Sequence, residues 1–108
     1  MEIKETPTFT KQVTALLSDD EYRLLQSALL MNPEMGPVIP ESGGIRKVRW
    51  GAQGRGKRGG VRVIYYWMIS RECMYMLLVY SKPRQDDLTP DQVKILKRVV
   101  EEELANEG

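Results

Sequence analysis

"VRVIYYWMISRECMYMLLVY", residues 61–80, decides the fold of this chain. At the start of residues 61–69, apolar and polar side chains alternate, and the stretch then becomes apolar on both faces. Residues 73–80 are apolar throughout. Runs of β-branched and aromatic residues of this length predict strands, and a continuous apolar run is typical of a central strand covered on both sides. The connection at residues 70–72 is short, which favours an antiparallel hairpin.

A further strand is predicted just before this hairpin, at residues 45–50. Its alternation places Val48 and Trp50 on one face of the strand and Lys47 and Arg49 on the other. Between Asn32 and this strand the chain is rich in proline and glycine, so we expect an ordered loop that crosses the surface.

Three amphipathic helices are expected around the strands. The first lies within residues 6–17, and Ser18 begins a capping-box pattern that opens the second. Thr89 is the N-cap of the third helix, with a proline at its first position. The apolar stripes of these helices are Phe9, Val13, Leu16 and Leu17; Tyr22, Leu25 and Leu29; and Val93, Leu96, Val100 and Leu104.

Together these elements predict a single α+β domain over residues 1–108. We expect a small antiparallel sheet of three to four strands, packed on the two N-terminal helices, with a C-terminal helix.

Composition excludes several classes of site. Histidine is absent and the single cysteine, Cys73, lies in an apolar run, which rules out the usual zinc sites and histidine bases. We therefore expect no metal and no cofactor. There is no run of about 18 apolar residues, and the first residues are acidic and polar, unlike a signal peptide. A cytoplasmic protein without membrane contact is expected.

The net charge of +1 conceals a strong asymmetry. Residues 42–71 contain eight cations and no carboxylate. Like charges at this density cost stability unless a polyanion neutralises them, so we expect RNA, DNA or an acidic protein segment as partner. The cations are Arg46, Lys47, Arg49, Arg55, Lys57, Arg58, Arg62 and Arg71.

The glycine-rich part of this region, residues 51–59, imitates two nucleotide-binding motifs. Both are rejected, because Arg58 stands where a P-loop needs Ser or Thr and a strand rather than a helix follows the glycines. The simplest interpretation is a solvated hairpin loop. The alternative is a loop whose cations contact several phosphates of one RNA strand.

The order of these features resembles the RelE/HigB superfamily of bacterial toxins, from Phe9 to about Leu104. "GKRGGVRVIYY", residues 56–66, is similar to the family's G-x-R-x-x-Y strand, and "VYSKPRQDDLTPDQ", residues 79–92, to its Y-x-K-x-x-x-x-D-L ending. The resemblance implies a metal-independent endoribonuclease that cleaves mRNA on the ribosome. It also implies neutralisation by an antitoxin, which in the HigB-like branch carries a helix-turn-helix domain (HigA-like).

The reaction that this implies is attack of an RNA 2′-hydroxyl on the adjacent phosphate. By resemblance, Arg62 matches the family's phosphate-stabilising arginine. Lys57 and Arg58 match the family's basic loop. Neighbouring cations should lower the pKa of Lys57 and favour it as the base, and either Tyr80 or Lys82 could supply a proton. The implied catalytic residues are Lys57, Arg62, Tyr80 and Lys82, and the implied RNA-binding residues are Arg46, Lys47, Arg49, Arg55 and Arg58.

Other interpretations stay open at this point. Arg62 and Lys57 are expected at the edge of the sheet, where Arg62 could simply face water, and Tyr80 could be a core residue. The family often has a further catalytic tyrosine near the C-terminus, but no tyrosine follows Tyr80 here. The identity of the general acid therefore stays open. A non-catalytic RNA- or DNA-binding module and a basic protein-interaction domain are the alternative functions. The larger aromatic side chains, Trp50, Tyr66 and Trp67, are expected in the core rather than stacked on bases.

Overall fold

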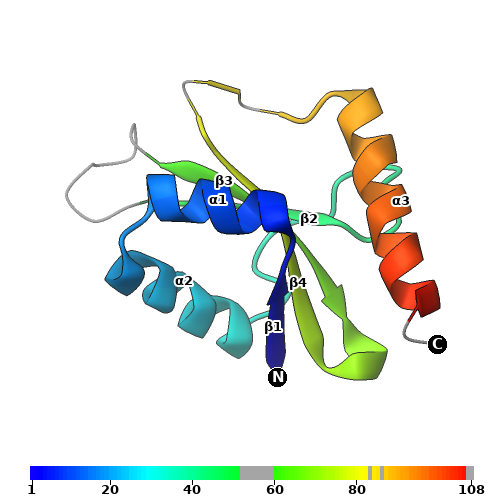
Figure 1. The fold of residues 1–108 in the computed structure, drawn as a ribbon, viewed down its shortest axis with the longest axis horizontal. Helices are drawn as coiled ribbons and strands as arrows, with labels where there is room; N and C mark the ends of the chain where they lie inside the picture. The colour runs from blue at the N-terminus through cyan, green and yellow to red at the C-terminus, as the bar shows by residue number, and fades with distance from the viewer. Residues whose placement is uncertain (52–59, 83, 86, 107–108) are drawn as a thin grey trace.

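The computed structural model describes residues 1–51, 60–82, 84–85 and 87–106, and in this part the chain forms a four-stranded sheet with helices on both faces (Figure 1). The sheet order is β1-β4-β3-β2. The predicted α+β class, with two N-terminal helices and one C-terminal helix, is confirmed. The elements are β1 (Glu2–Glu5), α1 (Pro7–Leu16), α2 (Asp19–Met31), β2 (Arg46–Trp50), β3 (Val61–Met68), a 3₁₀ turn (Ile69–Arg71), β4 (Cys73–Ser81) and α3 (Pro90–Asn106).

The predicted central hairpin is formed by β3 and β4. The two strands are antiparallel, with Val61 opposite Ser81 and Met68 opposite Cys73. The turn between them ends at Glu72, which has a left-handed backbone conformation with φ of 48°. β4 is flanked by strands on both sides and most of its side chains are buried, as expected of a central strand.

The first strand, β1, was not expected from the sequence. It pairs in parallel with β4, from Glu2 opposite Cys73 to Glu5 opposite Met76, so the sheet is mixed and the prediction of a wholly antiparallel sheet is wrong in this detail. Three of its four residues are charged, which hides the strand signal but suits a short edge strand that must resist pairing with other chains.

Thr6 joins β1 to α1 and fixes both to the central strand. Its backbone N–H donates to the Met76 carbonyl at 3.0 Å, and its hydroxyl donates to the Leu77 carbonyl at 2.8 Å. The same hydroxyl oxygen accepts from the Phe9 N–H at 3.0 Å, which makes Thr6 the N-cap of α1. One buried side chain therefore sets where the strand ends and where the helix begins.

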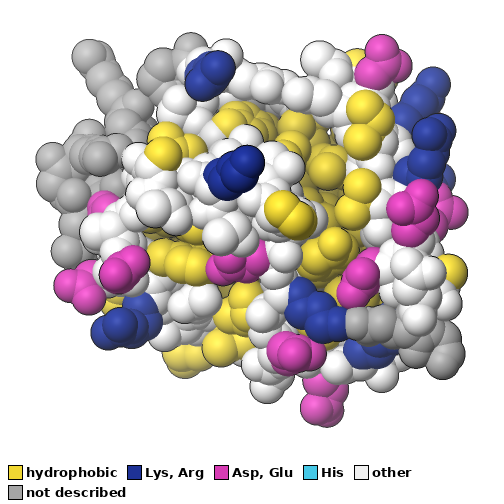
Figure 2. Space-filling view, viewed as in Figure 1, with side chains coloured by type: hydrophobic (Ala, Val, Ile, Leu, Met, Phe, Trp, Pro, Cys, Tyr) yellow, Lys and Arg dark blue, Asp and Glu magenta, His cyan; other side chains and the backbone are white. Residues whose placement is uncertain are grey.

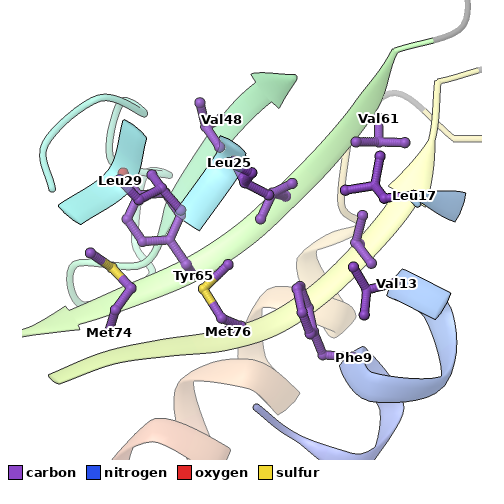
Figure 3. Packing of buried hydrophobic residues seen from close by; sticks show 12 residues of the cluster. Phe9, Val13, Leu17, Leu25, Leu29, Val48, Val61, Tyr65, Met74 and Met76 are labelled. Atoms are coloured by element: carbon purple, nitrogen blue, oxygen red, sulfur yellow. The ribbon is translucent and has the colours of Figure 1, made fainter. Parts of the chain in front are cut away.

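The two faces of the sheet carry separate hydrophobic layers. α1 and α2 pack on one face, where Figure 3 shows helix side chains gathered against Tyr65 and Met76 of the sheet. α3 packs on the other face through Leu96 and Val100. The predicted stripes of all three helices are confirmed, since their buried members are Phe9, Val13, Leu17, Leu25, Leu29, Leu96 and Val100.

Both predicted capping patterns are present. The Glu21 N–H donates to the Ser18 hydroxyl at 3.1 Å, and the Ser18 N–H donates to the Glu21 carboxylate at 2.8 Å. At the start of α3 the Gln92 N–H donates to the Thr89 hydroxyl at 3.1 Å, and the Thr89 N–H donates to the Gln92 side-chain oxygen at 2.9 Å. Each reciprocal pair satisfies backbone groups that the first helical turn leaves open.

The loop between α2 and β2 is held against the sheet by a buried tyrosine. The Tyr65 hydroxyl donates to the Pro33 carbonyl at 2.7 Å and accepts from the Gly36 N–H at 3.0 Å. The Arg46 guanidinium then donates to the Gly36 carbonyl at 2.8 Å. Gly36 lies so close to β2 that an added Cβ would come within 2.6 Å of the Lys47 carbonyl oxygen.

We predict that Gly36→Ala destabilises the fold by about 1–3 kcal/mol, because the new methyl group would meet backbone and force the loop off the sheet. Gly51→Ala is the matched control, since a Cβ there meets nothing within 4 Å. Urea unfolding of both variants measures the difference. Equal free energies of unfolding for the Gly36 variant and the wild type would contradict the close packing of this loop.

Candidate phosphate-binding site

Three predicted site residues lie in one row across the sheet. The register places Arg49 on β2 opposite Arg62 on β3, and Arg62 opposite Tyr80 on β4. Directly opposed residues in antiparallel strands share a face, and Tyr80 belongs to the hydrophobic layer under α3. Lys82 follows the end of β4, where its N–H donates to the Gly60 carbonyl at 3.3 Å. The row therefore lies on the α3 side of the sheet, at the end where β3 begins.

A cavity of about 340 Å³ opens at this end of the sheet. Three cations line it, and none of its described lining residues is a carboxylate. Such a concentration of positive charge in a concave site is suited to an anion with several acceptor oxygens, such as a phosphate. We call it the cationic cavity; its lining residues are Arg49, Trp50, Gly51, Gly60, Arg62 and Lys82.

Arg62 lies deeper than its sequence suggested. Only 4% of this residue is exposed, and it belongs to β3, which is an inner strand because β2 pairs along its outer side. The expectation of a side chain at the sheet edge is therefore wrong for Arg62. A guanidinium stays charged in proteins, and a buried cation acts on an anion through a lower effective dielectric than an exposed one.

A counter-charge for the basic region comes from a distant part of the sequence. The Lys47 ammonium forms a hydrogen-bonded ion pair with the carboxylate of Asp87, 40 residues further along the chain. This hydrogen bond and the charge of Lys47 lower the pKa of Asp87, and the charges of Arg49 and Arg62 lower it further. Asp87 therefore lies within the electric field of the cationic cavity.

Two cations of the region are placed elsewhere. Arg46 is on the opposite face of β2 from Lys47 and Arg49, where it holds the Gly36 carbonyl. Arg71 lies at the other end of the hairpin and donates to the Glu103 carbonyl at 3.2 Å and the Leu104 carbonyl at 2.5 Å. These contacts give both arginines structural roles, and neither lines the cationic cavity.

Tyr80 lines a different hollow from the other candidate catalytic residues. Only 8% of Tyr80 is exposed, and it faces a hollow of about 390 Å³ together with Gln12 of α1 and Gln92 of α3. The structure thus brings Arg62 and Lys82 together but places Tyr80 beside them, toward the helices. The predicted loop residues Arg55, Lys57 and Arg58 lie outside the described residues.

Trp50 has a position that sequence reasoning did not assign to it. It packs against the hydrophobic layer under α1 and α2, as expected of a core residue, and it also lines the cationic cavity. Tyr66 and Trp67 are half-buried and pack against the layers of their own faces. Trp50 is therefore the aromatic side chain of the described cavity lining, next to cations that suit phosphates.

No protein-family model matches the chain. In the described part of the chain, none of the helices is both long and apolar enough to cross a lipid bilayer. Within the same residues, no three side chains of the Cys, Asp or Glu type are grouped so as to hold a metal ion.

We predict that Asp87 titrates below its ordinary value of 3.8. A carboxyl whose pKa is lower in the folded state stabilises the fold above the unfolded-state pKa, and this contribution is lost as pH falls through the folded value. Lys47→Gln should return the pKa of Asp87 toward 3.8, and Lys11→Gln, on α1, should not. Carbon-detected NMR of the carboxyl groups measures this. An ordinary pKa for Asp87 in the wild type would contradict the ion pair.

Proposed function

We propose that this protein is a toxin of the RelE/HigB kind, an endoribonuclease that cleaves mRNA on the ribosome and is neutralised by a helix-turn-helix antitoxin. The observation that carries the proposal is the cationic cavity, where Arg49, Arg62 and Lys82 converge from three segments of the chain. Its position agrees with the residues that carry the family resemblance, and the α+β arrangement is compatible with a RelE-like fold.

The chemistry uses charge that is already in place. Attack of the 2′-hydroxyl on the adjacent phosphate gives a phosphorane with more negative charge on its oxygens than the bound RNA has. Arg62 is held on an inner strand by the packing around it, so it stabilises that charge with little reorganisation. Lys82 is exposed at the cavity and carries ammonium protons, one of which can pass to the leaving 5′ oxygen.

A non-catalytic RNA-binding module is the second candidate, and one observation favours it. The described lining of the cationic cavity contains no tyrosine and no carboxylate that would take the proton from the 2′-hydroxyl. The proposed base, Lys57, lies outside the described residues. A binding module would use the same arginines as phosphate contacts and would need no base at all.

The first test separates catalysis from binding at Arg62. Because Arg62 is nearly buried, we choose Arg62→Lys and Arg62→Gln rather than alanine, which would leave a cavity. In single-turnover cleavage on programmed ribosomes, Arg62→Gln should lower the saturated rate roughly 100-fold or more, as for loss of one oxyanion-type donor. Arg62→Lys should retain more activity than Arg62→Gln, because it keeps the charge but loses the bidentate geometry.

Arg23→Gln, on the exposed surface of α2, is the control for this experiment. Thermal unfolding establishes that all three variants are folded. If folded Arg62→Gln cleaves at the wild-type rate once saturated, Arg62 is only an anchor for the phosphate. A wild type that binds RNA but never cleaves it on ribosomes would establish the binding module instead.

The toxin proposal also predicts growth arrest. Expression of this chain alone in a bacterium should stop growth and produce new mRNA 5′ ends within open reading frames, because no antitoxin covers the site. Arg62→Gln at equal expression should relieve both effects. Unchanged growth and intact transcripts at verified wild-type expression would overturn the proposal.

A further inference from the structure

The charges of α3 are divided along its length. The exposed cations Lys94, Lys97 and Arg98 lie in the N-terminal half, and Glu101, Glu102 and Glu103 follow in the C-terminal half. A helix dipole favours the reverse order, with acidic residues toward the N-terminus and basic residues toward the C-terminus, most strongly in the end turns. Asp91 in the first turn follows this preference, whereas the glutamates toward the C-terminus and the cations before them do not.

The cations of α3 are available to a ligand. Lys94, Lys97 and Arg98 are exposed, and none of them has an ion-pair partner among the described residues. Figure 2 shows Lys and Arg side chains gathered over the N-terminal part of α3, along the right edge of the view. We call these three residues the α3 basic patch.

Two adjoining hollows lead from the α3 basic patch to Lys47 of β2. Lys94 and Lys97 line a hollow of about 460 Å³ between α3 and the loop before β2. A second hollow, of about 320 Å³, is lined by Lys47 and Asp87. The two hollows share an apolar floor made of Ile39, Pro40 and Leu88.

The last step of this line runs along β2. Lys47 and Arg49 are two residues apart on one face of the strand, a separation of roughly 7 Å, and Arg49 lines the cationic cavity. Among the described residues, two carboxylates lie on the way: Asp87, which is paired with Lys47, and Glu41, which lines the α3 hollow. In the lining that the structure describes, cations outnumber carboxylates along this line.

We propose that the α3 basic patch is a second RNA-binding surface, which holds the strand that continues from the phosphate in the cationic cavity. This rests on the proposed function. A single strand suits this line because its phosphates can meet the cations at both ends while the sugars between them lie over the apolar floor. The partner is thus the substrate RNA itself, at nucleotides away from the reacting phosphate.

The test compares short and long RNA. Lys94→Gln with Lys97→Gln removes two charges from exposed helix positions at little cost to the helix. Lys11→Gln with Arg23→Gln removes two charges from α1 and α2 and is the matched control. The probes are fluorescent mixed-sequence 2′-O-methyl RNAs of about 4 and about 12 nucleotides, which bind but lack the attacking hydroxyl. Affinity is measured by anisotropy across a range of salt concentrations.

We expect the wild type and the control to bind the long RNA more tightly than the short one. The α3 variant should lose roughly tenfold in affinity for the long RNA, and its salt slope should fall by about 1.4, or 0.7 for each lost phosphate contact. Its affinity for the short RNA should match that of the wild type. Equal binding of the long RNA by variant and wild type would overturn the second surface.

Two further outcomes would also overturn this proposal. If the α3 variant loses affinity equally for the short and the long RNA, the α3 cations act as part of the cationic cavity rather than as a separate surface. Tighter, patch-dependent binding of poly-glutamate than of long RNA would assign the patch to an acidic protein partner. Since binding is read without cleavage, this test stands even if the wild type cleaves no mRNA on ribosomes, so failure of the nuclease proposal is distinguishable from failure of the second surface.

Discussion

The structure depends on one constraint, which is that β4 is apolar on both faces. A strand of this kind is stable only when both faces are covered and both edges are paired. α1 and α2 supply one cover and α3 the other, while β3 and β1 pair along its two edges. The two ends of the chain are thereby drawn to the same strand. Lys4 of β1 and Glu103 of α3, whose charged atoms lie 3.4 Å apart, join the ends directly.

The same constraint explains where the charged site lies. Hydrophobic cover is needed along the middle of the hairpin, so cations can gather only where the layers end, near the start of β3 and the end of β4. Arg62 is nearly buried there beside Arg49, and such proximity of like charges costs free energy in the absence of an anion. Asp87 offsets part of that cost from outside the sheet. A bound phosphate would add to this compensation, as the proposed role of the cavity in RNA binding requires.

The sequence predicted the helices and the hairpin because their signals are local: periodicity, capping patterns and a short connection. It did not predict β1, because this strand has no pattern of its own and forms only by pairing with distant residues, from Glu2 with Cys73 to Glu5 with Met76. The depth of Arg62 depends on strand order, which a hairpin alone does not specify. Arg46 could have been placed correctly, since the alternation that sets Lys47 and Arg49 on one face puts Arg46 on the other. The Lys47–Asp87 pair joins segments 40 residues apart and has no local signal.

The position of α3 connects the core to the surface charge. One face of the helix must cover β4, so its outer face is free to carry charge without loss of packing. Part of the acidic end of this helix is held within the chain, because Lys4 pairs with the Glu103 carboxylate and Arg71 donates to the backbone carbonyls of Glu103 and Leu104. Its basic end has no such partner among the described residues. One charge at the acidic end is therefore neutralised by the chain itself, whereas the three cations of the α3 basic patch have no ion-pair partner in the described part of the chain.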